Sequence, residues 1–226
     1  MTTDFSASFL VVFTALMPII NPPGTALLFL AITRRASREL RHTLARKIAI
    51  NSIFVILPSM YFGAFVLRMF GISIPVLRLA GGLVLAAAGW RMLNAPSGPD
   101  ADASGPDTLN DKNLANLAFY PLTLPLTAGP GTISVSIAIG SSQSRQLARD
   151  WGEMLSSLLG GLTAVGATAL AIYLCYRYAD RIQDTVGEAV SEALARVFAF
   201  ILICLGVQIL WNGFAELWMD MLASRP

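Results

Sequence analysis

The sequence predicts an all-α, polytopic membrane protein with six transmembrane helices, arranged as two inverted three-helix repeats whose first and fourth helices are broken. Of the 226 residues, 55% are hydrophobic and 13% are charged, whereas an average soluble domain carries about 25% charged residues. The apolar residues are also gathered into long runs instead of being dispersed. These observations exclude an ordinary soluble domain.

Six membrane spans are predicted from the stretches that lie between charged residues. A bilayer core needs about 20 consecutive apolar residues per helix, so stretches of that length indicate crossings. Only one of them contains a charge, Arg78. The predicted spans are residues 5–33, 48–67, 69–90, 113–144, 154–176 and 197–215. Together they occupy most of the chain and leave no room for a separate soluble domain.

The segment 94–113 is predicted to be a flexible linker between two halves. It is rich in Pro, Gly, Ala, Ser and Asp and has too few apolar side chains to form a packed core. The predicted domains are therefore a first three-helix repeat at 1–93, the linker, and a second three-helix repeat at 114–226. Because each repeat has an odd number of spans, the two repeats must have opposite orientations in the membrane.

Two internal matches support a duplication. Residues 18–25 and 125–132, which are 107 positions apart, share their first proline and a Pro-Gly-Thr sequence. A second match, at an offset of 118, pairs Arg78 with Arg196 and Asn94 with Asn212 across the third span of each half. Both matches fall in corresponding spans and in the same order, which is typical of an inverted-topology repeat.

The distribution of Lys and Arg predicts that both termini are periplasmic. The positive-inside rule places the more basic loops in the cytoplasm. With the N-terminus outside, eleven Lys and Arg residues fall in cytoplasmic loops and four fall on the opposite side. The cluster at 34–47 contributes most to this difference and is expected to anchor the topology against lipid headgroups. The linker would then be cytoplasmic.

Residues 177–196 predict an amphipathic helix. Charged side chains recur there at four-residue intervals, with apolar residues between them. A helix with this pattern is expected to lie on the membrane surface.

The first and fourth spans are each interrupted by a Pro-Gly sequence inside their apolar run. Pro22 and Pro23 have no amide proton, and Gly24 permits backbone angles at which a helix can restart. Pro130 and Gly131 repeat this pattern. Backbone groups that such a break frees are costly in lipid, so each break is expected to be buried in protein or to line a wet cavity. This requirement points to a binding site at the breaks.

The two restarted helices predict a site for a small zwitterion. Their N-termini would offer free amides and a partial positive charge to a carboxylate, while the carbonyls that end the preceding half-helices could face an ammonium group. The predicted substrate-binding residues are Asn21, Pro22, Gly24, Thr25, Thr127, Gly129, Gly131 and Thr132. Two alternatives stay open: the breaks are packing kinks, or the segments are re-entrant hairpins that change the span count.

Arg78 is a secondary candidate for ligand contact, because it is the only charge well inside a span. Alternatively, its long side chain anchors the helix by reaching the outer interface, since it lies only about 9 Å along the helix from Ile72. Glu216, near the end of the last span, is expected to reach that interface in the same way. Small residues at helical spacing in the third and fifth spans, such as Gly82 and Gly160, are expected to allow close helix packing.

The sequence offers no residue set for catalysis or for a metal. The single histidine, His42, lies in the basic loop, and no Asp or Glu lies in the middle of a span, whereas an intramembrane enzyme needs such groups. Cys175 and Cys204 lie far apart inside spans and indicate neither a disulfide framework nor a zinc site. We expect no enzyme activity, no cofactor, no metal and no nucleic-acid partner. A non-transporting membrane scaffold or regulator stays open as an alternative.

At these motifs the sequence resembles the MarC family of bacterial inner-membrane proteins, which is related to the SnatA small neutral amino-acid transporters. The matching segments are residues 21–22, 70–75, 78–82, 121–125, 127–133, 206–208 and 212–213. The resemblance implies six helices, an inner-membrane location, and transport of small neutral amino acids such as alanine or glycine, with lipids as the other partners. Many relatives carry an aspartate before the first proline, where this chain has Asn21. Drug efflux, which the family name suggests, has no support in the residues.

Overall fold

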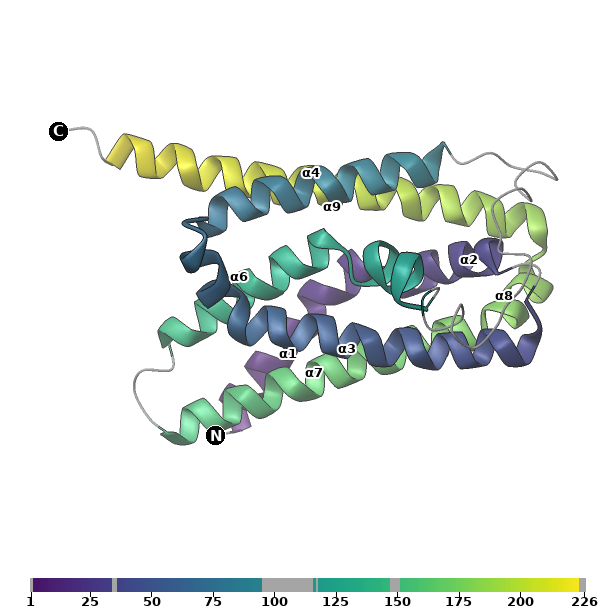
Figure 1. The fold of residues 1–226 in the computed structure, drawn as a ribbon, viewed down its shortest axis with the longest axis horizontal. Helices are drawn as coiled ribbons and strands as arrows, with labels where there is room; N and C mark the ends of the chain where they lie inside the picture. The colour runs from purple at the N-terminus through teal and green to yellow at the C-terminus, as the bar shows by residue number, and fades with distance from the viewer. Residues whose placement is uncertain (1, 34–35, 95–115, 117, 147–150, 224–226) are drawn as a thin grey trace.

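The computed structural model describes residues 2–33, 36–94, 116, 118–146 and 151–223, and the regular elements in these ranges are all helices. The predicted all-α class is thereby confirmed. Figure 1 shows an elongated bundle in which the long helices run along a common direction. Apart from Asn94, the predicted linker lies outside the described residues.

The described part of the first half forms α1 (Thr2–Ile20), α2 (Pro22–Ile32), α3 (Arg38–Met69) and α4 (Ile74–Leu93). The described part of the second half forms the irregular, wide helix η2 (Ala118–Thr127), then α6 (Pro130–Gln146), α7 (Trp151–Arg177), α8 (Ala179–Val186) and α9 (Glu188–Ala223).

Five described segments are long and apolar enough to cross a membrane: Phe5–Leu30, Arg38–Met69, Ile74–Leu93, Met154–Arg177 and Val190–Ala223. They correspond to five of the six predicted spans. The predicted span at 113–144 is not among them, because it is divided into η2, of 10 residues, and α6, of 17 residues. Each piece is shorter than the roughly 20 residues that a single crossing needs.

The antiparallel helices α4 and α9 pack against each other with their backbones in contact (Figure 1). A Cβ atom added to Gly82 would lie 2.6 Å from the carbonyl oxygen of Gly206, and one added to Gly213 would lie 2.6 Å from that of Pro75. No side chain fits in so small a space. The prediction that the glycines of the third span allow close packing is therefore confirmed.

The main contacts of α1 to α4 are with helices of the second half. The pair α1 and α2 packs on α7, while η2 and α6 pack on α3; α2 also meets α9, and α6 meets α4. At the contact of α7 with α1, a Cβ added to Gly160 would lie 2.6 Å from the carbonyl oxygen of Phe5, so this glycine also serves close packing. The two halves therefore share one apolar core instead of folding side by side.

The predicted amphipathic helix over 177–196 is wrong as a single helix. Gly187 has a φ of +83°, which interrupts the helix between α8 and α9. The acidic face of α8 is held by the basic segment of α3: Asp180 lies 2.7 Å from Arg41, and Asp184 lies 3.6 Å from Arg38. Because these partners lie far away in the sequence, periodicity alone did not reveal them.

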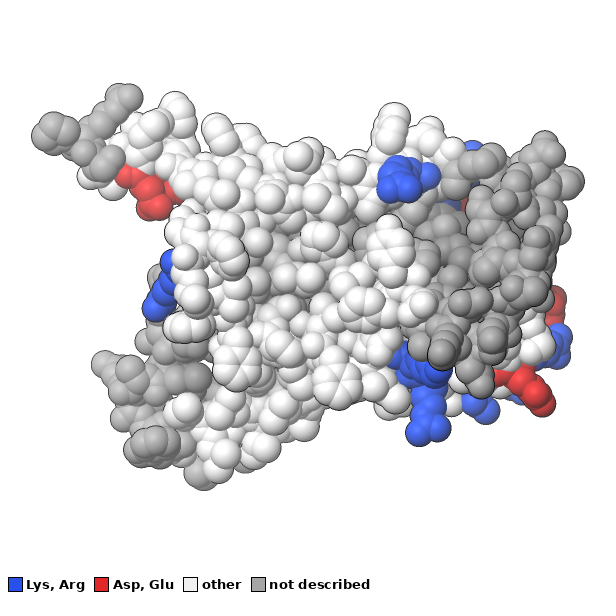
Figure 2. Space-filling model, viewed as in Figure 1, with Lys and Arg blue, Asp and Glu red and all other residues white. Residues whose placement is uncertain are grey.

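Charged side chains gather at the two ends of the molecule. Figure 2 shows Lys and Arg concentrated at the end where α8 lies, and a broad central region of the visible face without charge. We call these the basic end and the far end. The basic end includes Arg38, Arg41, Arg46, Lys47, Arg91, Arg177, Arg181 and Arg196; the far end includes Arg68, Glu216 and Asp220. An uncharged belt between two polar ends suits a bilayer-spanning bundle.

Candidate functional site

The first break lies at Asn21, between α1 and α2. Asn21 has φ +47° and ψ +60°, a left-handed conformation that ends a right-handed helix. Its Oδ1 accepts a hydrogen bond from the N–H of Gly24 at 3.3 Å, and its carbonyl oxygen accepts one from the N–H of Thr25 at 2.9 Å. Pro22 and Pro23 have no N–H to offer. Every amide in the first turn of α2 is thus accounted for within the described range 2–33, which corrects the expectation of free amides there.

The second break lies between η2 and α6. Tyr120 and Leu124, inside η2, have extended backbone angles near φ −128°, ψ 123° and φ −111°, ψ 122°. Each of them precedes a proline, and a following proline disfavours the helical conformation. The N–H of Ala128 donates to the carbonyl oxygen of Thr123 at 2.9 Å and closes this irregular segment. The fourth predicted span is therefore broken as expected, but its first part is more irregular than the sequence suggested.

The N-terminus of α6 differs from that of α2. The first backbone bond of α6 runs from the N–H of Ile133 to the carbonyl oxygen of Gly129, at 3.0 Å. The N–H groups of Gly131 and Thr132 precede this bond and have no acceptor within the helix. These two amides also carry the partial positive charge of the helix N-terminus. The second break therefore keeps the backbone amides on which the predicted anion site depends, whereas Asn21 caps the first break.

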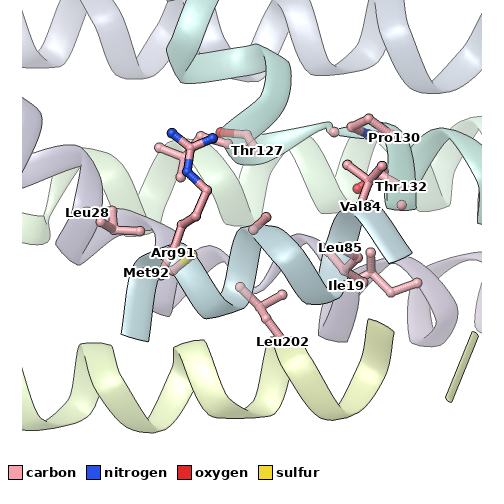
Figure 3. A pocket seen from close by; sticks show the side chains of 14 residues that line it. Ile19, Leu28, Val84, Leu85, Arg91, Met92, Thr127, Pro130, Thr132 and Leu202 are labelled. Carbon is pink, nitrogen blue, oxygen red and sulfur yellow. The ribbon is translucent and has the colours of Figure 1, made fainter. Parts of the chain in front are cut away.

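A cavity of about 280 Å³ opens at this helix start, and we call it the α6 cavity (Figure 3). Residues of both broken spans, of α4 and of α9 line it. Four of the predicted site residues are among them: Thr127, Gly129, Gly131 and Thr132. The other four, Asn21, Pro22, Gly24 and Thr25, do not line the cavity.

The residues of the first break are instead held by packing. A Cβ added to Gly24 would lie 2.6 Å from the Cβ of Phe198 in α9, so this glycine allows a close helix contact. Thr25 is 1% exposed, and its hydroxyl donates to the carbonyl oxygen of Asn21 at 3.0 Å. Pro22 is also buried. The Nδ2 group of Asn21 is buried and has no hydrogen-bond partner among the described residues.

Tyr176, at the end of α7, connects the two breaks. It is 1% exposed, and its hydroxyl lies 2.7 Å from Oγ1 of Thr127 in the second break. Its ring stacks on Phe29 of α2, with ring centroids 4.8 Å apart. The sequence alone does not indicate this role of Tyr176, because a tyrosine at the end of a span ordinarily indicates the membrane interface.

Arg91 brings a positive charge to the α6 cavity. It lies in the last turn of α4 and lines the cavity wall. Figure 3 shows its side chain extending toward Thr127. A guanidinium group carries five donors in a fixed plane and can bind a carboxylate with two parallel hydrogen bonds. In the sequence Arg91 is only a loop charge, because its reach into the cavity depends on the arrangement of α4 and η2 around that space.

Arg78 lies toward the opposite end of α4 and does not line the α6 cavity. It forms an ion pair with Glu216 of α9. The side chains of the two residues are 31% and 44% exposed, respectively. The sequence predicts that Arg78 and Glu216 reach the outer membrane interface independently of each other. This prediction is incomplete, because the two side chains pair with each other across the α4–α9 contact.

Comparison with known proteins assigns the chain to a family. A family model described as "MarC family integral membrane protein" matches residues 6–218. The chain is 35% identical over 208 residues to the UPF0056 inner membrane protein MarC of Salmonella typhimurium (strain LT2), which covers 89% of this chain and 91% of that protein. The protein of the same name from Escherichia coli (strain UTI89) is 36% identical with the same coverage. No solved structure matches the chain.

Proposed function

The chain belongs to the MarC family of integral membrane proteins, and from this premise we propose that it transports small neutral amino acids across the inner membrane. The single observation that carries the proposal is the α6 cavity, where an arginine and open backbone amides face one space at a break in the fourth predicted span. Transporters commonly bind substrate near the membrane centre at such broken helices.

The carboxylate of the substrate would be bound by Arg91 and by the amides of Gly131 and Thr132. A carboxylate that leaves water needs compensating hydrogen bonds, and each charge-assisted bond contributes about 1.5–3 kcal/mol. The guanidinium and the helix N-terminus supply both the donors and the positive charge. The ammonium group would face the carbonyls at the end of η2, since the last carbonyls of a helix have no partner within it.

The remaining walls favour a small and uncharged side chain. Val84, Leu85 and Ala88 of α4 contribute apolar surface, and the cavity has a volume of about 280 Å³. A charged substrate side chain would lose its hydration in this space without gaining a partner among those three residues. Alanine and glycine, whose side chains are a methyl group and a hydrogen, meet this restriction.

We also propose six spans arranged as an inverted repeat. The contacts between the halves are consistent with this symmetry. Each main contact turns into a contact that is also observed when the helices are exchanged in pairs: α1 with η2, α2 with α6, α3 with α7 and α4 with α9. For example, α1 on α7 becomes η2 on α3, and the α4–α9 contact becomes itself. Such a symmetry supports alternating access by motion of one repeat against the other. The basic end would be cytoplasmic and both termini periplasmic.

We propose a transport role in preference to an enzymatic one. The polar groups that line the α6 cavity are a guanidinium, backbone amides and threonine hydroxyls. These groups bind a carboxylate, but they do not form the acid–base or nucleophile pair that catalysis would use.

The test is uptake of labelled alanine and glycine by liposomes that contain the purified protein. Saturable uptake above that of protein-free liposomes is expected, and unlabelled alanine should compete with the labelled amino acid. Sodium and pH gradients applied separately would identify any coupling ion. If the folded protein neither binds nor transports either amino acid, the proposed function is wrong.

A further inference from the structure

A second polar cavity, of about 430 Å³, lies at the far end between α3, α4, α6 and α9, and we call it the far cavity. Its lining contains two arginines, two carboxylates and several serines. The lining residues that matter here are Arg68, Ser73, Arg78, Ser142, Glu216 and Asp220. The charges of the four ionic residues balance, so the cavity combines strong polarity with no net charge.

The Arg78–Glu216 ion pair is accessible from this cavity. Both residues line it, and both side chains are partly exposed. An ion pair in contact with water contributes little to stability, because solvent screens it and the side chains lose freedom. A ligand that offers the same two charges can therefore replace the pair without leaving a charge unpartnered.

Arg78 also lines a third cavity, of about 350 Å³, together with Ile209 and Asn212 of α9. Asn212 and Ile209 precede Glu216 by about one and two helical turns, so this space lies further along α9 from the far end. Ala138 and Ser142 of α6 line both spaces as well. The Arg78 side chain thus lines two neighbouring cavities.

The ion pair is not the only contact between α4 and α9 at this end of the helices. At this level the two backbones already touch, since a Cβ added to Gly213 would lie 2.6 Å from the carbonyl oxygen of Pro75 and 3.0 Å from the Cβ of Arg78. Besides this helix contact, the pair faces the far cavity, where both of its residues are available to a ligand.

We propose that Arg78 and Glu216 form a recognition site for amino-acid zwitterions at the far end, distinct from the α6 cavity. The carboxylate of the ligand binds Arg78 and its ammonium group binds Glu216, so two ion pairs replace one. An anion or a cation alone would pair with only one of the two residues, whereas a zwitterion pairs with both, which makes a zwitterion the matching ligand class. This inference rests on the proposed function, because the far-end site would supply the same substrate to the α6 cavity.

The test is protection of a cysteine in the far cavity by the amino acid. Cys175 and Cys204 are first replaced by alanine, and Ser73→Cys then places a thiol in the cavity lining. Saturating alanine should slow maleimide labelling of this thiol several-fold. Met69→Cys, exposed at the same end but outside the cavity lining, is the matched control and should label at the same rate with and without alanine.

Adding Glu216→Gln to the Ser73→Cys protein should remove the protection. The same substitution should raise the KM for uptake from the far side about tenfold, as expected for loss of one charge-assisted hydrogen bond. Equilibrium binding at the α6 cavity should not change. Unprotected labelling in a protein that still binds alanine would overturn the recognition site while leaving the transport function intact. A folded protein that does not bind alanine at all would overturn both.

Discussion

The hydroxyl of Tyr176 lies 2.7 Å from Oγ1 of Thr127, and the ring of Tyr176 stacks on Phe29 of α2. One buried side chain of α7 therefore contacts both broken helices. If the two halves move against each other during transport, the contacts of Tyr176 must either break or hold α7 and the two broken helices together as one moving unit. Tyr176 thus couples the self-capped first break to the open second break.

Tyr176→Phe should lower the maximal transport rate while keeping the fold. The phenyl ring preserves the stacking on Phe29, and Thr127 keeps its bond to the carbonyl oxygen of Leu122, at 2.7 Å. Only the link between the breaks is lost, at a cost of about 1 kcal/mol in stability. Uptake rates and thermal unfolding measured on the same preparations check this. Tyr173→Phe, which removes a hydroxyl bonded to Arg177 instead, is the matched control and should transport normally.

Gly131→Val should abolish transport, whereas Thr132→Ser should largely preserve it. A Cβ at position 131 would already lie 3.1 Å from the Cβ of Leu85, and the branched valine side chain would add bulk at the cavity wall. Thr132→Ser keeps the amide and the hydroxyl. Alanine and glycine uptake at matched expression levels checks this. Normal flux through the Gly131→Val protein would show that the break is only a structural kink.

Asn21→Gly should be less destabilising than Asn21→Ala. Both substitutions remove the Oδ1 that accepts from the N–H of Gly24, which costs about 1 kcal/mol. Alanine is in addition strained at a φ of +47°, by about 1–2 kcal/mol, whereas glycine adopts this conformation freely. Thermal unfolding of the two variants in one detergent gives the comparison. Equal melting temperatures would mean that the left-handed conformation at this break does not persist in the membrane protein.

The two breaks could be predicted from sequence because proline and glycine act locally. Pro22 and Pro130 interrupt a helix whatever surrounds them, and the apolar runs on either side mark the spans. The capping of α2 by Asn21 was also within reach of local reasoning, since asparagine is a preferred N-cap residue. Pro22 and Pro23 have no N–H, and the cap binds the next N–H. Together these two facts indicate that the first turn of α2 has no free backbone N–H.

The rest of the site depends on helix packing that no local pattern encodes. Arg91 reaches the α6 cavity only because the fold places α4 and η2 around the same space. Arg78 and Glu216 are 138 positions apart, and they meet because glycines let α4 and α9 approach closely. For each of these residues the sequence indicates a charge within or near the end of a span, and only the fold determines which neighbour it faces.

The central claim is that the α6 cavity binds the carboxylate of a small amino acid, and calorimetric titration of the purified protein tests it most directly. Alanine should bind, while alaninamide, which lacks the carboxylate, should not. Arg91→Gln should weaken alanine binding about tenfold or more through loss of charge-assisted bonds, whereas Arg46→Gln, at the same basic end but outside the cavity lining, should leave it unchanged. Equal affinity for alanine and alaninamide, or unchanged binding in Arg91→Gln, would contradict the account.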